Sequence, residues 1–122
     1  MASTRETRQQ LLYQSVLDLL ANKWTLPVIC ALEGGPERFG ELQRNLHGVN
    51  PKVLTRTLRR LQEFGIVERV VYPSVPLRVE YSLTELGHSS TGPLQAILSW
   101  TENLLADSAA PSRRPRDEQL IS

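Results

Sequence analysis

Four basic side chains and one amide follow one another at helical spacing in the middle of the chain, and this arrangement suits the binding of a polyanion. They are Asn50, Lys52, Arg56, Arg59 and Arg60. Asn50 precedes a proline, a pair typical of a helix start, and steps of three or four residues place the cations on one helix face. Because guanidinium groups bind phosphate oxygens and a helix fits the major groove of duplex DNA, the sequence predicts a DNA-contacting helix. A solvated charged surface is the alternative interpretation.

Position along this helix suggests different roles for its residues. Those in the first half are predicted to reach base edges, whereas Arg59 and Arg60 are predicted to bind phosphates. The complete set of predicted DNA-binding residues is Arg38, Asn50, Lys52, Val53, Arg56, Arg59, Arg60 and Arg78. Arg78 is predicted to contact phosphate or the minor groove from a β-hairpin, with pairing to Glu80 or Glu68 as the alternative.

The charge of the chain is concentrated in the same region. The whole chain carries a formal net charge of only +1. Between Arg38 and Arg78, eight Arg or Lys residues stand against three Glu residues, a net charge of +5, so the remainder carries −4. Phosphate binding depends on a local basic patch and not on the total charge, so this distribution favours contact with DNA.

No set of residues predicts catalysis, a cofactor or a metal site. Cys30 is the only cysteine, so no internal disulfide is possible, and its apolar neighbours predict a buried thiol. His47 and His88 give no metal-ligand spacing with it. Gly34-Gly35 lacks the Lys-Ser/Thr of a phosphate-binding loop and is interpreted as a helix cap. We therefore predict that the protein is not an enzyme.

Two helices are predicted before the basic region. The first covers residues 9–20, with Leu12, Val16 and Leu19 on one face. Thr25 is predicted to cap the second, which carries Pro27 in its first turn. The predicted start of the core consists of Trp24, Val28, Ile29 and Leu32.

A helix-turn-helix and a hairpin are predicted next. A short helix in residues 39–48 ends at a glycine, and the basic helix then runs from Asn50 to Gly65. Its apolar side consists of Leu54, Leu58 and Leu61. The runs 66–72 and 77–83 are rich in β-forming residues, and prolines bound the turn between them, which predicts a hairpin.

A final apolar helix is predicted after Thr84, with Gly92-Pro93 as a site where it bends or divides. We expect one domain over residues 8–107, between a flexible arm at 1–7 and a disordered tail at 108–122. The predicted fold class is mostly α (α+β): a winged helix-turn-helix with a wing of two to three strands and terminal dimerisation helices.

Several sequence strings resemble the HxlR-type regulators, within the broader MarR- and ArsR-like winged-helix group. They are KWT at 23–25, Arg38-Phe39 with Glu41-Leu42, the run VLTRTLRRLQEFGIVER, the wing VYPSVPLRVEYSLTELG and a tryptophan at position 100. The resemblance implies a homodimer joined by its terminal helices, whose two recognition helices meet successive major grooves. It also implies regulation of transcription through double-stranded DNA.

The sequence departs from this family at two places, and one of them bears on sensing. Thiol-sensing members carry a cysteine where this chain has Leu11, so redox sensing by that route is not expected. Ala21-Asn22 stands where many relatives have two glycines, and nothing in the sequence explains this difference. Tyr13, Trp24 and Trp100 are predicted to lie in the core near the dimer interface. A second hypothesis is that they line a pocket for a small aromatic effector.

These predictions combine into one function. We expect a cytoplasmic, homodimeric DNA-binding regulator of a pseudo-palindromic operator, without a membrane anchor or cofactor. The alternative is a winged-helix module that binds an acidic protein partner through the same basic residues.

Overall fold

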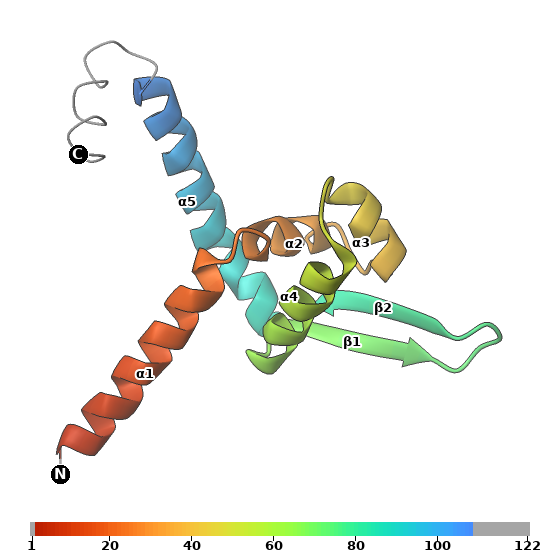
Figure 1. The fold of residues 1–122 in the computed structure, drawn as a ribbon, viewed down its shortest axis with the longest axis horizontal. Helices are drawn as coiled ribbons and strands as arrows, with labels where there is room; N and C mark the ends of the chain where they lie inside the picture. The colour runs from red at the N-terminus through yellow and green to blue at the C-terminus, as the bar shows by residue number, and fades with distance from the viewer. Residues whose placement is uncertain (1, 109–122) are drawn as a thin grey trace. The chain divides into compact units, whose positions relative to one another are not determined.

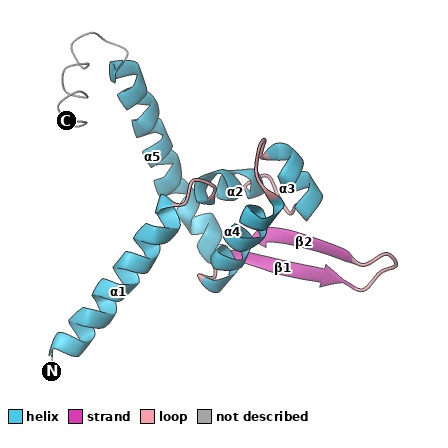
Figure 2. Cartoon of the chain, viewed as in Figure 1, coloured by secondary structure: helices cyan, strands magenta, loops and turns pink. Residues whose placement is uncertain are grey.

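The computed structural model describes residues 2–108 of the chain (Figures 1 and 2). It divides into two compact units, Met1–Ser89 and Ser90–Ser122, and the boundary lies inside the last helix. In chain order the elements are α1 (Ala2–Ala21), α2 (Thr25–Leu32), α3 (Phe39–Asn45), α4 (Pro51–Glu63), β1 (Val67–Tyr72), β2 (Arg78–Leu83) and α5 (Glu85–Ser108). The predicted fold class, a mostly helical winged helix-turn-helix, is confirmed.

The core of the first unit lies where α2, α3 and α4 meet the base of the β1–β2 hairpin (Figure 1). The predicted apolar faces of α2 and α4 are confirmed, because their residues are 0–1% exposed: Val28, Ile29, Leu32, Leu54, Leu58 and Leu61. Trp24, predicted to belong to this core, is only half-buried. Burial of each leucine contributes roughly 2 kcal/mol of transfer free energy, so these faces determine how α4 is oriented.

Helix α1 differs from its prediction in where it begins and in how much of its apolar face is buried. It begins at Ala2, so residues 2–7 are helical where the sequence predicts a flexible arm. No glycine or proline interrupts residues 2–21, which explains why the helix continues. Of the predicted apolar face, Leu19 is buried but Leu12 is 56% exposed. Only the end of α1 next to α2 therefore joins the core.

The junction between α1 and α2 depends on a different residue from the one predicted. The sequence predicts that Thr25 caps α2, but its buried hydroxyl donates a hydrogen bond of 2.6 Å to the Leu19 carbonyl. The Asn22 side chain instead accepts from the Trp24 amide at 2.9 Å. Pro27 falls in the first turn of α2, as predicted.

The wing is a two-stranded antiparallel sheet that extends away from the helices (Figure 2). Its register pairs Val67 with Leu83 at the base and Tyr72 with Arg78 near the tip. Glu37 adds one isolated bridge to Tyr81, which accounts for the third strand that the sequence left open. Leu77, predicted within the second strand, lies outside it and is 64% exposed.

Helix α5 begins as predicted. The Thr84 hydroxyl accepts from the Gly87 amide at 3.0 Å, and the Thr84 carbonyl accepts from the His88 amide at 2.8 Å. The helix continues through Gly92 and Pro93, so it is not divided there. The predicted disordered tail lies outside the described residues, apart from Ser108 at the end of α5.

Among the described residues, no single helix is long and apolar enough to cross a membrane. The segments Thr4–Ala21 and Thr25–Leu32 meet that test only as a pair bent by 77°.

Candidate nucleic-acid interface

The orientation of α4 exposes its basic side chains. Asn50 caps the helix as predicted, because its side-chain oxygen accepts from the Lys52 amide at 2.8 Å. The opposite face is anchored in the core by the three buried leucines, so the side chains of Lys52, Arg56 and Arg59 are left exposed. We call these three cations the basic face of α4.

Two predicted contacts lie at the edge of this face. Val53 and Arg60 are half-buried, since a helical step of seven residues places them together between the core and the basic face. The Val53 carbonyl accepts a hydrogen bond of 2.8 Å from the buried Thr57 hydroxyl. The six predicted residues of this helix therefore fall into three groups: three exposed cations, one N-cap and two half-buried residues at the edge of the basic face.

An open groove runs along the basic face, and three of its lining residues, Phe39, Pro51 and Thr55, are absent from the predicted DNA-binding set. It is lined by Phe39, Pro51, Lys52, Thr55, Arg56 and Arg59. Thr55 follows Lys52 by three residues and precedes Arg59 by four, so helical periodicity alone was sufficient to find it. Phe39 comes from α3, and no spacing within α4 pointed to it.

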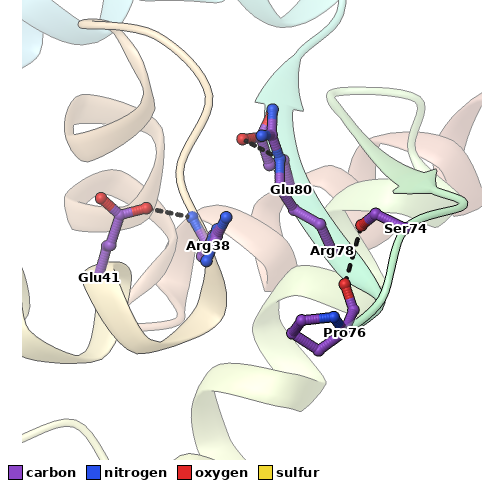
Figure 3. A network of polar contacts seen from close by, with 6 residues as sticks. All are labelled: Arg38, Glu41, Ser74, Pro76, Arg78 and Glu80. Carbon is purple, nitrogen blue, oxygen red and sulfur yellow. Dashed lines mark hydrogen bonds and ion pairs between the residues drawn. The ribbon is translucent and has the colours of Figure 1, made fainter.

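The turn between α3 and α4 places the two helices as a helix-turn-helix. Gly48 adopts a φ of +84°, which a side chain rarely tolerates, as the sequence predicts for a tight exit from α3. Arg38 precedes α3 and is exposed, and its backbone amide donates to Glu41 Oε1 at 2.9 Å (Figure 3). This bond fixes the backbone at Arg38 and leaves its guanidinium available at the surface.

Glu37 links α3 to the wing. Its backbone exchanges hydrogen bonds of 2.8 and 2.9 Å with Tyr81 of β2, and its Oε1 accepts from Asn45 of α3 at 2.9 Å. Its second carboxylate oxygen is buried without a hydrogen-bond partner among the described residues. Burial, and secondly the charge of Glu41, raise the pKa of Glu37 above its usual range.

This raised pKa predicts a pH dependence of stability. A carboxyl group whose pKa is higher in the folded than in the unfolded state favours folding below the unfolded value, about 4.3 for glutamate, and loses that contribution as pH rises through the folded value. The free energy of unfolding of the wild type, relative to that of Glu37→Gln, should therefore be larger at pH 4 than at pH 7. Urea unfolding at several pH values measures it, and the exposed Glu63→Gln is the control. An equal difference at both pH values would contradict this account.

Arg78 stands at the start of β2 and already has two intramolecular contacts. Its Nε lies 3.2 Å from Glu80 Oε2 (Figure 3). Its guanidinium carbon lies 4.6 Å from the centre of the Tyr72 ring. The ion pair between Arg78 and Glu80, the alternative that the sequence predicts, is thus present in the structure. Its side chain is nevertheless 44% exposed, so contact with a second molecule is sterically open.

The structure also bears on two other kinds of chemistry, thiol reactivity and metal binding. Cys30 is half-buried, and burial together with the nearby Glu33 charge raises the pKa of its thiol, which disfavours the reactive thiolate. Within residues 2–108, no group of three or more His, Cys, Asp or Glu side chains is arranged to hold a metal.

The three aromatic residues of the effector hypothesis are not enclosed within this chain. Tyr13 is 59% and Trp100 62% exposed, so their predicted place in the core is wrong for the isolated chain. Trp24 is half-buried, with the Lys23 ammonium 5.3 Å from its ring centre. Tyr13 and Trp100 instead belong to exposed apolar surfaces of α1 and α5, respectively.

Comparison with known proteins agrees with this geometry. A family model described as HxlR-like helix-turn-helix matches residues 19–109. An uncharacterized HTH-type transcriptional regulator of Methanothermobacter thermautotrophicus is 44% identical over 81 residues, which span 66% of this chain and 62% of that protein. The chain thus covers less than two thirds of that relative.

Two solved structures are similar over most of their length. The transcriptional regulator YtfH of Salmonella typhimurium is 36% identical with a TM-score of 0.73, over 83% of this chain and 90% of that one. The redox regulator HypR in its reduced form is 33% identical with a TM-score of 0.68, over 88% of this chain and 97% of that one.

Proposed function

Because the chain belongs to the HxlR-like helix-turn-helix family of transcriptional regulators, we propose that it binds a pseudo-palindromic DNA operator as a homodimer. The observation that carries the proposal is the exposed basic face of α4, which lies opposite a fully buried leucine face. In this proposal α4 enters the major groove, and the wing follows the adjacent DNA backbone. Asn50, Val53 and Arg60 lie at the margins of the contact, and Arg38 approaches from the start of α3.

Footprinting on DNA upstream of the protein's own gene tests this function. A dimer should protect two half-sites whose centres lie about 10 bp, one helical turn, apart. Affinity should fall steeply with salt, each phosphate contact adding about 0.9 to the log–log slope. A module that binds only an acidic protein would give no preference for one DNA segment over bulk DNA.

An exposed apolar surface on α1 supports the second copy as a partner. Tyr13, Leu17 and Leu20 follow one another at steps of four and three residues and are 59%, 63% and 37% exposed. Exposed leucines on one helix face are typical of a helix that packs against another chain. Separately, α5 exposes Ile97, Trp100, Leu104 and Leu105.

Leu17→Glu should therefore convert the dimer into a monomer, because it places a charge within this apolar face. Light scattering after gel filtration measures the mass. The control is Ser15→Glu, which adds the same charge on the other side of α1. If Leu17→Glu leaves the dimer intact, α1 is not the dimer contact. The substitution should also weaken operator binding, since each half-site then binds independently.

An effector is the second part of the proposal. The residues proposed to contact it are Tyr13, Trp24 and Trp100, because aromatic side chains suit a small aromatic ligand, and the raised pKa of the Cys30 thiol argues against a thiol sensor. Metabolite titrations that follow both tryptophan fluorescence and operator affinity test this part. A ligand that changes neither is excluded as the effector.

A further inference from the structure

The outer half of the wing carries a single positive charge, and the structure holds that charge in place. Residues 70–77 are all uncharged, so Arg78 is the charged residue nearest to the tip of the hairpin. Tyr72 stands directly opposite Arg78 in the register, and Val70 stands opposite Glu80. Side chains alternate between the two faces of a strand, so Tyr72, Arg78 and Glu80 share one face of the wing.

The contacts of Arg78 leave the outer edge of its guanidinium available. The ion pair uses Nε, at 3.2 Å from Glu80, and the guanidinium carbon lies 4.6 Å from the Tyr72 ring centre. Among the described residues, neither terminal amino group of Arg78 has a hydrogen bond. A phosphate can therefore bind those two groups end-on without displacing Glu80.

The hairpin next to this cluster is itself constrained. The Ser74 amide donates to the Tyr72 carbonyl, and the Ser74 hydroxyl donates to the Pro76 carbonyl, both at 2.8 Å (Figure 3 shows the second). These bonds fix the backbone that follows Tyr72. The Tyr72 ring is therefore attached to a hydrogen-bonded turn, which restricts where the ring can contact the Arg78 guanidinium.

We propose that Tyr72 is a positioning residue for DNA binding: its ring holds the Arg78 guanidinium against the wing, so that the terminal amino groups are presented to a backbone phosphate. An arginine held in this way loses less side-chain freedom on binding than one that is free in solvent. The inference rests on the proposed function, because it concerns the same DNA contact.

Operator affinity of full-length variants tests the proposal. Tyr72→Leu should weaken binding about two- to fivefold, the range that corresponds to a cation–π contact at an exposed site. Tyr72→Phe keeps the ring and should bind like the wild type. Arg78→Ala should weaken binding and lower the salt slope by about 0.9, the value for one phosphate. In the Arg78→Ala background, Tyr72→Leu should have no further effect.

Each other outcome overturns a distinct statement. Weakening by Tyr72→Phe, or by Tyr72→Leu in the absence of Arg78, would mean that Tyr72 contacts DNA itself. Unchanged binding by Tyr72→Leu would mean that Arg78 needs no positioning. If Arg78→Ala binds normally while substitutions on α4 abolish binding, the wing is not a contact, although the proposed function stands. If neither Arg78→Ala nor the substitutions on α4 weaken operator binding, the proposed function fails as well.

Discussion

Replacing Arg56 and Arg59 together by alanine is expected to weaken operator binding at least about 100-fold, because each removes a charge-assisted hydrogen bond of roughly 1.5–3 kcal/mol. Both side chains are exposed on the basic face of α4 and line its groove. If both bind phosphates, the salt slope should fall by about 1.8. Fluorescence anisotropy with labelled operator DNA over a range of salt concentrations measures affinity and slope.

The two single variants, Arg59→Ala and Arg56→Ala, should differ in how they affect the sequence specificity of binding. Arg59→Ala should weaken binding to all DNA sequences about equally, whereas Arg56→Ala, nearer the start of α4, should also reduce discrimination between the operator and mismatched sites. This difference separates a phosphate contact from a base contact.

A matched control removes the same charge from another part of the first unit. Arg5 and Arg8 are exposed on α1, whose first half points away from α4 (Figure 1). Their double alanine variant should bind the operator within about threefold of the wild type, as expected for screened surface charges. Equal losses in the two double variants would mean that total charge, and not the basic face of α4, drives binding.

Gly87→Ala is expected to destabilise the fold by about 3 kcal/mol, since overpacking a rigid site costs 1–3 kcal/mol and sometimes more. A Cβ atom at Gly87 would lie 2.2 Å from the Ile66 carbonyl oxygen and 3.2 Å from Leu83 Cβ. The backbone has little room to shift, because the Thr84 amide donates to that same carbonyl at 3.0 Å. The first turn of α5 is thereby tied to the residue that precedes β1.

Gly92→Ala is the matched control for this prediction. It makes the same substitution in the same helix, but no atom lies within 4 Å of the added Cβ. Alanine favours a helix over glycine by about 1 kcal/mol, so this variant should be at least as stable as the wild type. Urea unfolding compares the two, and similar stabilities would contradict the steric account of Gly87.

Local sequence features determined most of the helical framework and the basic face. The Asn50-Pro51 pair begins α4, and the leucines at 54, 58 and 61 with the cations at 52, 56 and 59 divide its surface into two faces. These properties depend on backbone geometry and helical periodicity, which act over a few residues. For the same reason Gly48 and Thr84 were assigned correctly to a turn and a cap.

Other properties depend on segments that are distant in sequence. The periodicity of α1 predicted a buried Leu12, yet only the end of α1 reaches α2, so that residue is exposed. Nothing near Thr25 indicated that its hydroxyl would satisfy the Leu19 carbonyl and not cap α2. The pattern of a helix face shows that it is apolar, but the tertiary structure decides how much of it is covered.

The candidate interface divides in the same way. Its cations on α4 are a property of the sequence, whereas Phe39 lines the same groove from α3, on the other side of the turn at Gly48. The orientation of Arg78 depends on strand register, which brings Tyr72 opposite it across the hairpin. The sequence by itself determined which residues carry charge and which helix presents it. Only the tertiary structure decided which neighbours hold those charges in place, because packing and strand pairing join residues that local periodicity cannot relate.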